Sequence, residues 1–386
     1  MDPHPDQPVV PDDLLVCRNR IDAIDNQILD LLAARKAVVN EVIGVKQRHG
    51  LKVRDRVRET DLLKDRRMRC DALGLRHDVI ESLYRVVLTA SRDHQAAMGT
   101  ERPPDLAERT VAIIGGNGGM GRLFARVFED LGQHVLIADL DTTLTPIEAV
   151  QQADAVLLSV PMEATLEVIA ELGGHVKDDG LLFDLTSTKT APIEAMCAAS
   201  RCDVIGLHPM FGPSIHTMQE QRIVVVPARC REGSPWPKWL EAILLARGFA
   251  LLESDAEQHD QAMGIVQVLT HFSTEVLGLA MARSGVPVSR TLEFASPVYL
   301  IELVMTARHF CQSPELYGAI HAANPNRQAI LDGFQASLES WKAAVECGDL
   351  VAFERLFNES HAYFGDVSKH AMEQSSYLID RLVERG

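Results

Sequence analysis

The sequence predicts a multidomain chain with an all-α N-terminal domain, a central doubly wound α/β domain and an all-α C-terminal domain. Three observations carry this prediction. Apolar residues recur at helical spacing over the first hundred residues, a glycine cluster then opens an alternation of strands and helices, and helical periodicity runs from residue 255 onwards. We place the domains at 1–100 (helices over about 12–97), 110–254 and 255–386, with a linker at 101–109.

The composition limits the partners. The net charge of −16 disfavours nucleic acid and anionic membranes, so anionic ligands need local clusters of Arg and Lys. No run approaches about 18 apolar residues, which predicts that no segment spans a membrane. Residues 1–13 have the composition of a frayed tail, not of a signal peptide, and the seven cysteines lack metal-site or disulfide-framework spacing. We therefore expect a cytoplasmic protein without a metal.

The first hundred residues predict three helices. Apolar positions from Leu14 to Val45 favour one uninterrupted helix from about Asp12 to Gly50, followed by helices over roughly 56–73 and 76–97. A helix of this length exceeds what ordinary globular packing requires. We therefore expect this domain to complete its core with a second copy of the chain, as a homodimer.

Cationic side chains on the long helix suggest an anion site. Arg35 and Lys46 lie within roughly 20° of one face and about 16 Å apart, so their side chains could bracket a small dianion. Arg18 lies about 26 Å from Arg35 and roughly 100° around the helix. Arg18 is therefore either a surface charge or a contributor to the partner subunit's site.

The central domain opens with a dinucleotide-binding pattern. A β-branched run at 111–114 leads into Gly116, Gly118 and Gly121, which fit G-x-G-x-x-G, and Gly119 and Met120 open the following helix. Such glycines allow the backbone to approach a pyrophosphate at a helix N-terminus. The pattern alone is a weak signal.

An acid after the next strand specifies the cofactor. Asp139 follows strand 134–138 and lies 18 residues after Gly121, where such folds place the carboxylate that accepts from the adenosine ribose. No Arg or Lys follows in residues 140–143, which favours NAD over NADP. Further strands are expected at 155–160, 181–187, 204–207 and 222–226. Ser159 and Pro161 belong to the ligand-binding edge of that sheet.

Two sets of residues carry a resemblance to known families. The first resembles the active site of the all-helical chorismate mutases and comprises Arg18, Arg35, Lys46, Asp55, Arg58, Glu59, Ser91 and Gln95. The second is similar to prephenate dehydrogenase and comprises the string 206–213 (GLHPMFGP), preceded by 186–189 (TSTK) and followed by 257–260 (EQHD) and 267–271 (QVLTH). In this order the chain resembles, over about residues 14–370, the bifunctional chorismate mutase–prephenate dehydrogenases (T-proteins) of tyrosine biosynthesis.

The resemblance implies roles for the first set. Chorismate would rearrange to prephenate in an intertwined homodimer in which Arg18 reaches the opposite subunit's site. Arg18, Arg35 and Arg58 would hold the two carboxylates, and Ser91 belongs to the same binding set. Lys46 and Gln95 would donate to the ether oxygen as negative charge grows there, while Glu59 and Asp55 would orient the substrate hydroxyl or the cationic groups.

The resemblance also implies roles for the second set. His208 would take the proton of the ring hydroxyl, Ser187 would hydrogen-bond near that hydroxyl, and NAD would be the oxidant. Prephenate would be bound by Lys189, Gln267, His271 and Arg308. Gln267 and His271 are i and i+4 and face one spot, whereas His259 lies roughly 120° from His271, which favours a structural role for it.

Several alternatives stay open on the sequence. The N-terminal domain could be a mutase-like dimerisation or regulatory module, and the dehydrogenase could use arogenate. Feedback inhibition by tyrosine is implied by the resemblance alone. Closely related bifunctional enzymes carry arginine where this chain has Leu300, so an effector or carboxylate contact there is in doubt.

Overall fold

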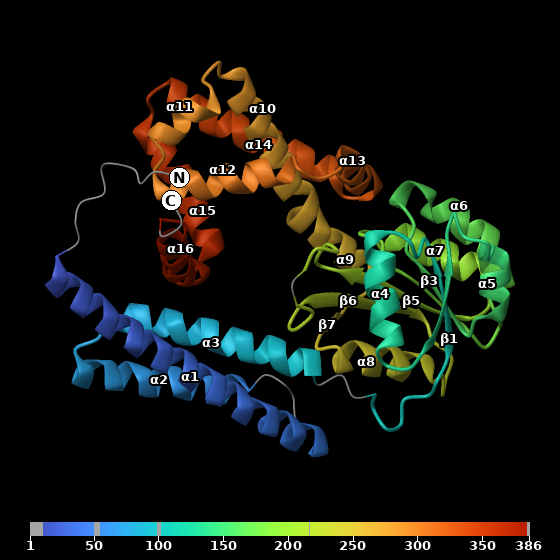
Figure 1. Cartoon of the computed structure of the whole chain (residues 1–386). Coiled ribbons are helices and arrows are strands. Elements are labelled where there is room, and N and C mark those ends of the chain that lie inside the picture. Colours follow the sequence, from blue (N-terminus) through green and yellow to red (C-terminus); the bar gives the residue numbers. More distant parts are fainter. Residues whose placement is uncertain (1–10, 50–54, 99–101, 216, 384–386) are drawn as a thin grey trace, which may run out of the picture.

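The structure is a computed structural model that describes residues 11–49, 55–98, 102–215 and 217–383. Its elements form three groups: three N-terminal helices, a seven-stranded sheet with helices on both faces, and a C-terminal set of helices (Figure 1). This arrangement confirms the predicted fold class. Most of the predicted N-terminal tail lies outside the described residues, and Asp12 and Asp13 already belong to the first helix.

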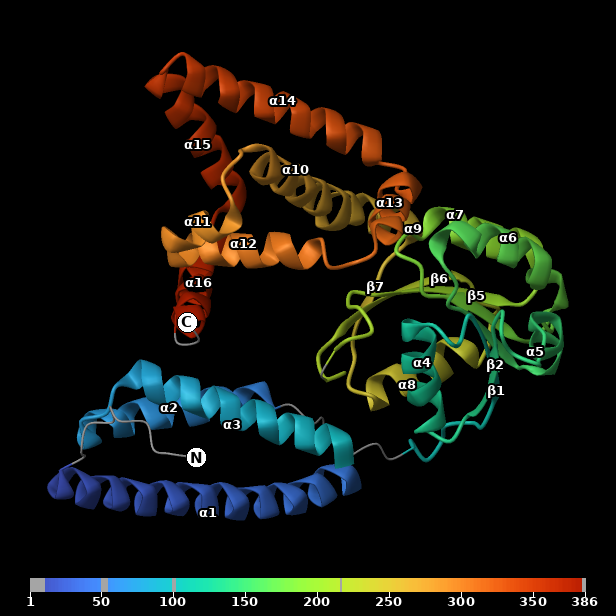
Figure 2. The ribbon, with the colours of Figure 1, turned by 45° about the horizontal axis from the view of Figure 1, so that its top comes forward.

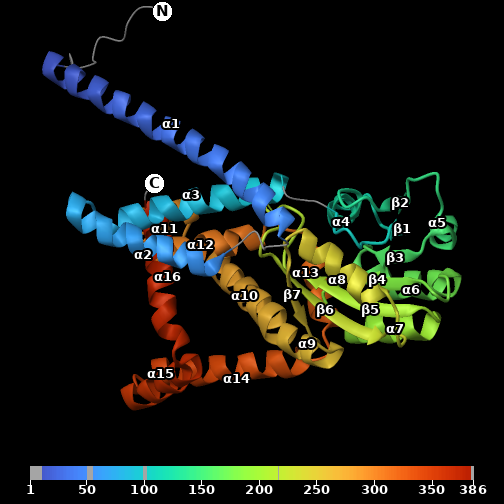
Figure 3. The same cartoon turned by 90° about the horizontal axis from the view of Figure 1, so that it is seen from below.

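The N-terminal group consists of α1 (Asp12–Arg48), α2 (Arg56–Leu73) and α3 (His77–Met98). α1 is 37 residues long, as its uninterrupted apolar pattern predicts. Figures 2 and 3 show its N-terminal half standing away from α2 and α3. The apolar side chains of that half are exposed, for example Ile21 and Ile24 at 56% and Ile28 at 47%. Within one chain, α1 therefore has a long apolar face that α2 and α3 do not cover.

The central sheet has the strand order β2-β1-β3-β4-β5-β6-β7. Strands β1 to β5 are parallel, β6 is antiparallel to β5, and β7 is parallel to β6. The order reverses between β1 and β3, which is where open α/β sheets bind ligands. The bounds are β1 Thr110–Ile114, β2 His134–Ala138, β3 Ala155–Leu158, β4 Leu181–Asp184, β5 Asp203–Pro209, β6 Arg222–Arg229 and β7 Ala250–Glu253.

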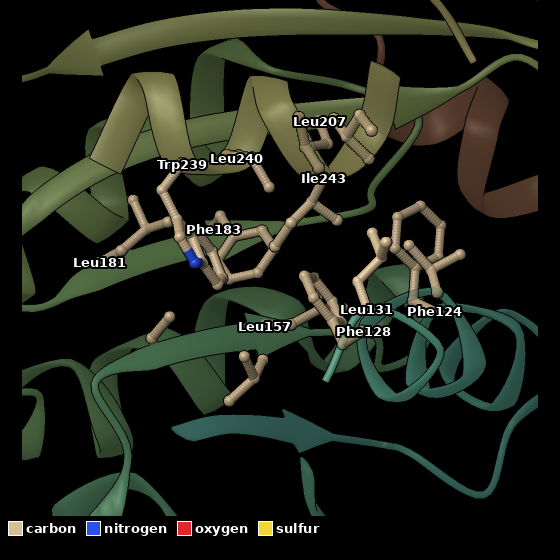
Figure 4. Packing of buried hydrophobic residues seen from close by; sticks show 14 of the residues in the cluster. Phe124, Phe128, Leu131, Leu157, Leu181, Phe183, Leu207, Trp239, Leu240 and Ile243 are labelled. Atoms are coloured by element: carbon tan, nitrogen blue, oxygen red, sulfur yellow. The ribbon is translucent and has the colours of Figure 1, made fainter. Parts of the chain in front are cut away.

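Helices cover both faces of the sheet, so its central strands are apolar on both sides. On β1, Val111 and Ile113 face one core and Ala112 and Ile114 face the other. The first core packs against α4 (Gly119–Glu129) and α8 (Trp236–Ala246), and contains the stacked rings of Phe128 and Trp239, 5.9 Å apart (Figure 4). The second packs against α5 (Pro146–Gln152), α6 (Met162–Leu172) and α7 (Thr190–Ala199), and a short 3-10 turn, η1 (Gly173–His175), follows α6.

The C-terminal group begins where the sequence indicates a helix start, because the Asp255 side chain accepts from the Gln258 amide at 2.8 Å. One continuous helical segment follows, made of α9 (Ala256–Met263), a π-helical stretch η2 (Gly264–Leu269) and α10 (Thr270–Arg283). The remaining helices are α11 (Val288–Glu293), α12 (Pro297–His309), α13 (Pro314–Ala323), α14 (Arg327–Glu346), α15 (Leu350–Phe364) and α16 (Val367–Val383).

The segment Ala256–Arg283 departs from the expectation of no membrane-spanning stretch. By length and composition it is the one helix among the described residues that could cross a membrane, with a mean hydropathy of 1.3 over its most apolar window. Only 6% of that window is buried within the single chain. The same segment carries the polar residues His259, Asp260, Gln267 and His271.

Candidate active sites

The glycine turn after β1 is closed by contacts that only glycine permits. Gly115, which the sequence analysis omitted, directly follows β1 and has φ +77°. A Cβ at Gly121 would lie 2.5 Å from the Gly115 carbonyl oxygen, and one at Gly116 would lie 2.6 Å from Ile137 Cγ2. Strand, turn and helix therefore pack backbone to backbone, which is the cradle a pyrophosphate requires.

The other predicted cofactor residues surround this turn. Gly118 is the N-cap of α4, and Gly119 and Met120 form its first turn. Asp139 follows β2, and its carboxylate accepts from the amides of Asn117 (2.9 Å) and Leu140 (2.8 Å). Ser159 donates its amide to Ile114 O at 2.8 Å and borders Gly115, and Pro161 is the N-cap of α6. This donor set fits NAD.

His208 lies inside β5, opposite Val224 of β6, and not after the strand as predicted. Its side chain is 2% exposed. His208 Nδ1 is 2.9 Å from His259 Nε2, and Gln267 Nε2 is 3.4 Å from His208 Nε2. Burial, followed by the charges of Lys189 and His259, lowers the pKa of His208 well below 6.5 against the opposing charge of Asp260. The imidazole is therefore neutral at physiological pH, as a general base must be.

The structure contradicts the helical geometry from which a structural role was expected for His259. That expectation assumed a regular α-helix, but η2 lies between His259 and His271. Because an i→i+5 turn contains more residues than an α-turn, each of its residues rotates the helix by less than 100°. His259 and Gln267, eight residues apart, consequently both contact His208.

Asp260 was also missed by the sequence analysis. It is 1% exposed, accepts from His259 Nδ1 at 2.8 Å, and accepts from the amides of Lys189 (2.8 Å) and Thr190 (2.9 Å) at the start of α7. The only local signal was the His-Asp pair itself in the string 257–260, because its burial and its contact with Lys189 depend on distant segments.

Lys189 does not reach a substrate, which corrects the predicted binding role. Its side chain is fully buried, pairs with Asp184 and donates to Leu207 O at 2.8 Å. Removing one partner of such a pair costs about 3–5 kcal/mol because the other charge stays buried. Lys189 therefore fixes the strand that carries His208.

The remaining dehydrogenase residues occupy two places. Ser187 follows β4, is half-buried, and its hydroxyl has no hydrogen-bond partner among the described residues. His271 packs against Tyr317 and His309, with ring centroids 4.8 and 5.4 Å away. Exposed Arg308 at the end of α12 acts electrostatically on Tyr317. No contact in the described residues joins His271 or Arg308 to His208.

Part of the N-terminal set is assembled between α1 and α3. Arg35 donates to the Ser91 hydroxyl, which in turn donates to Val87 O at 2.7 Å. Gln95 is buried, and its Nε2 donates to Ser91 O at 3.2 Å. Gln95 Oε1 has no partner among the described residues.

Acidic residues of α2 face the same region. Burial lowers the pKa of Lys46, and the charges of Asp55 and Glu59 oppose that shift, so the three groups lie close together. Asp55 also caps α2 by accepting from the Arg58 amide at 2.9 Å. Glu59 additionally pairs with Arg92 at 2.8 Å, a residue absent from the predicted set.

Arg18 and Arg58 are exposed. Two cavities of about 490 and 200 Å³ lie between α2 and α3. Of the predicted set they share only Glu59, and their basic lining residues are Lys64, Arg67, Arg85 and Arg92. Neither cavity is lined by Arg35 or Lys46.

Comparison with known proteins matches each part of the chain to a family. Residues 17–96 match chorismate mutase type II, residues 133–238 the nucleotide-binding domain of prephenate dehydrogenase, and residues 255–359 its dimerization domain. The T-protein of Enterobacter agglomerans is 36% identical over 368 residues, covering 95% of this chain and 97% of the relative. That of Haemophilus influenzae is 32% identical over 364 residues, covering 94% and 96%.

Solved structures share the dehydrogenase fold. Prephenate dehydrogenase from A. aeolicus, in complex with hydroxyphenyl propionate and NAD+, has a TM-score of 0.55 at 20% identity and covers 70% of this chain and 99% of its own. Synechocystis arogenate dehydrogenase has a TM-score of 0.51 at 18% identity and covers 68% and 99%. At these identities the likeness concerns the fold alone.

The chain matches a mutase family in its first part and the two domains of a dehydrogenase family after it. The two T-proteins match the chain over nearly their full length. The chain therefore belongs to the T-proteins, the NAD-dependent bifunctional chorismate mutase–prephenate dehydrogenases of tyrosine biosynthesis.

Proposed function

We propose that the rearrangement of chorismate takes place in the three-helix unit around Arg35 and Lys46, and the oxidation of prephenate beside His208, within the domain boundaries given above. The observation that carries this assignment is the buried contact of His208 with His259. A parallel-sheet strand with helices on both faces normally takes an aliphatic residue at such a position. A pair of buried imidazoles there is best explained by proton transfer.

The mutase needs positioning and charge, because chorismate rearranges within one molecule and no covalent catalyst takes part. We assign the two carboxylates to the arginines Arg18, Arg35 and Arg58. Lys46 and Gln95 donate to the ether oxygen, which gains negative charge as its C–O bond breaks. Glu59 and Asp55 orient the substrate hydroxyl and Lys46, and the Ser91 hydroxyl holds Arg35.

Gln95 needs its amide in a particular orientation for this role. Its Oε1 is buried and has no partner among the described residues, whereas its Nε2 donates to Ser91 O. The amide nitrogen carries two N–H groups, so Nε2 can keep its hydrogen bond to Ser91 O and direct its second N–H to the ether oxygen.

A homodimer completes the mutase site. The exposed apolar side chains on the N-terminal half of α1 supply the contact surface, and a second copy would bring its Arg18 to the region of Arg35 and Lys46. The apolar face of Ala256–Arg283 belongs to the region that matches a dimerization domain, so a partner subunit also accounts for its exposure. We place this homodimer in the cytoplasm.

In the dehydrogenase, His208 Nε2 accepts the proton of the ring hydroxyl of prephenate. When bound, NAD would supply the acceptor for the hydride of the same carbon, and the ring carboxylate would leave as carbon dioxide to give 4-hydroxyphenylpyruvate. Gly116, Gly118 and Gly121 bring the backbone amides at the start of α4 to the cofactor's phosphates, and Asp139 accepts from its ribose. Ser187 donates near the reacting hydroxyl, and Gln267 borders His208 Nε2.

Arg308 supplies the positive charge for a prephenate carboxylate. Burial, followed by the neighbouring His309 and His321, lowers the pKa of His271 to about 4 against the opposing charge of Glu275. His271 is therefore neutral at physiological pH and contributes a hydrogen bond. A guanidinium keeps its charge at any accessible pH and can grip two oxygens.

The finer selectivity is part of the proposal. Asp139 and Asp141 both hydrogen-bond around Asn117, so the 2′-phosphate of NADP would meet two carboxylates, which favours NAD. We further propose prephenate over arogenate, and inhibition of the dehydrogenase by tyrosine.

One set of assays on the full chain tests this proposal. Chorismate alone should give prephenate, and addition of NAD should give NADH and 4-hydroxyphenylpyruvate, faster than with NADP or arogenate and more slowly with tyrosine present. His208→Asn should lower NADH formation by about 10²–10⁴-fold and leave mutase activity intact. Full dehydrogenase activity in that variant would contradict the role of His208. Absence of mutase activity in the wild type would instead favour the alternative that the N-terminal domain is a mutase-like dimerisation or regulatory module.

A further inference from the structure

A chain of three buried side chains connects α9 to the reacting edge of β5. Asp260 Oδ1 lies 2.8 Å from His259 Nδ1, and His259 Nε2 lies 2.9 Å from His208 Nδ1. The exposed fractions of the three side chains are 1%, 2% and 2%. Bulk water therefore does not compete for these hydrogen bonds, and each proton along the chain has a definite position.

The Asp260 end of the chain is an acceptor. Its carboxylate receives the amides of Lys189 and Thr190 together with His259 Nδ1. Burial opposes ionisation, but hydrogen bonds from His259, Thr190 and Lys189 outweigh it and lower the pKa of the Asp260 carboxyl. An ionised carboxylate only accepts, so the proton between Asp260 and His259 resides on His259 Nδ1.

The protons on the two imidazoles follow from this end. A neutral imidazole has one N–H, so neutral His259 with its proton on Nδ1 presents Nε2 as an acceptor. His259 repels a charge on His208 only when both imidazoles are protonated. His208 must then donate from Nδ1, and its own neutral form leaves Nε2 unprotonated. The nitrogen beside Gln267 is therefore the free base.

We propose that His259 and Asp260 are positioning residues of the dehydrogenase, which hold His208 in the Nδ1–H tautomer and leave Nε2 to take the proton of the substrate hydroxyl. This inference rests on the proposed role of His208 as the base. The wrong tautomer would present an N–H to the substrate, which cannot accept a proton.

The same three side chains also stabilise the product of proton transfer. Lys189, whose side chain is fully buried, disfavours a positive charge on His208, and the Gln267 amide on the opposite side is neutral. The charge of Asp260 favours protonated His208 and reaches it through His259. When His208 gains the hydroxyl proton, this relay of Asp260 and His259 therefore offsets part of the free-energy cost of an imidazolium in a buried strand.

A pair of substitutions at one position separates this role from simple packing. His259→Gln can place an amide oxygen near the position of Nε2 and so keeps an acceptor for His208 Nδ1–H, whereas His259→Met fills similar space without an acceptor. We expect His259→Met to lower kcat for prephenate by about 10²–10³-fold with a nearly unchanged KM, and His259→Gln to stay within about tenfold of wild type. Gln258→Met, at an exposed neighbouring position of α9, serves as the matched control and should behave as wild type.

Four measurements make the outcome decisive. Mutase activity and NAD binding report whether each variant is folded, and wild-type oxidation of prephenate tests the proposed function separately from the relay. In folded variants, equal losses for Gln and Met, or no loss for Met, would overturn the positioning role. Nitrogen-15 NMR of His208 in the wild type reads the tautomer without any substitution at position 259: Nδ1 protonated supports the proposal, and Nε2 protonated refutes it.

Discussion

At the residue scale, the burial of His208 determines when it can act as a base. Burial and the nearby Lys189 and His259 charges lower its pKa well below 6.5, while the Asp260 charge raises it. The neutral, proton-accepting form therefore persists to lower pH than for a histidine in water. The same environment protects the imidazole from protonation before substrate arrives.

This shift predicts the acid limb of the dehydrogenase. Activity requires neutral His208, so kcat/KM for prephenate should hold as pH falls through 6.5 and decline only through the lower pKa of the folded enzyme. The profile is measured between about pH 4.5 and 8, with mutase activity at each pH as the control for unfolding. A half-maximal kcat/KM at or above 6.5 would contradict the assignment of the limb to buried His208.

Asp139 governs cofactor choice through its charge. Its carboxylate accepts hydrogen bonds from the Asn117 and Leu140 amides, so it cannot change its orientation without losing those bonds. Asp139→Asn removes the charge that repels a 2′-phosphate and weakens the ribose contact, so the NAD/NADP ratio of kcat/KM should fall about tenfold. Asp141→Asn also removes a negative charge but leaves the predicted ribose acceptor Asp139 intact, so it should change the ratio less. An unchanged ratio in Asp139→Asn would place the ribose contact elsewhere.

At the element scale, the glycine turn depends on contact between backbones. A methyl group at Gly121 would overlap the Gly115 carbonyl at 2.5 Å, so strand β1 and helix α4 would have to separate. Gly121→Ala should therefore abolish measurable NAD binding, with mutase activity retained.

The control for this prediction is Gly174→Ala in the same domain. A Cβ at Gly174 would meet only Ala199 O, at 3.9 Å, which is ordinary van der Waals contact. NAD titration followed by fluorescence or calorimetry compares the two variants. If Gly121→Ala bound NAD with wild-type affinity, the turn would have room for a methyl group, and the prediction would be wrong.

The π-helical stretch η2 explains why helical geometry misplaced His259. Gly264–Leu269 interrupts an otherwise α-helical segment just where Gln267 contacts His208. Such stretches are rare and frequently occur at functional sites. Counting 3.6 residues per turn along the whole segment therefore places His259 on the wrong face of the helix. The sequence analysis nevertheless placed His259 correctly near the start of that helix.

At the scale of the whole molecule, α1 determines how the mutase is built. Its C-terminal half contacts α3 through Arg35 and Ser91, whereas its N-terminal half stands away with its apolar side chains exposed (Figure 3). Arg18 lies on that distant half, about 26 Å from Arg35 along the helix. Within one subunit, Arg18 therefore lies too far from Arg35 to contact the same small ligand.

Mixed dimers test this arrangement. Arg18→Ala and Lys46→Ala should each abolish most mutase activity, but subunits exchanged between the two variants should recover about a quarter of the wild-type rate, because each mixed dimer contains one intact site. Dehydrogenase activity serves as the control for assembly. If Arg18 served its own subunit's site, every site would carry a defect and no activity would return.

Much of the fold could be predicted from the sequence because its signals are local. The uninterrupted apolar period of α1, the N-cap at Asp255 and the glycines after β1 each act within a few residues, and the structure places those elements as predicted. Strand β7 and the extension of β5 through Pro209 were missed, since their pairing with β6 depends on distant segments.

The candidate sites divide in the same way. Residue type and spacing singled out Asp139, Arg35 and Lys46, whereas the resemblance singled out His208 and supplied the expected roles. Lys189 was assigned to substrate because its burial against Asp184 is a tertiary fact. Asp260 and Arg92 were overlooked because their partners, at Lys189 and Glu59, are far away in the sequence.

By itself, therefore, the sequence determined the order of the domains, the cofactor turn and the two sets of polar residues, since periodicity, caps and glycine patterns are written in neighbouring residues. Only the tertiary structure decided that His208 is buried against His259 and Asp260, and that Lys189 fixes its strand. The physical reason is that proton positions and pKa shifts arise from burial and from contacts between segments distant in the chain, which no local pattern records.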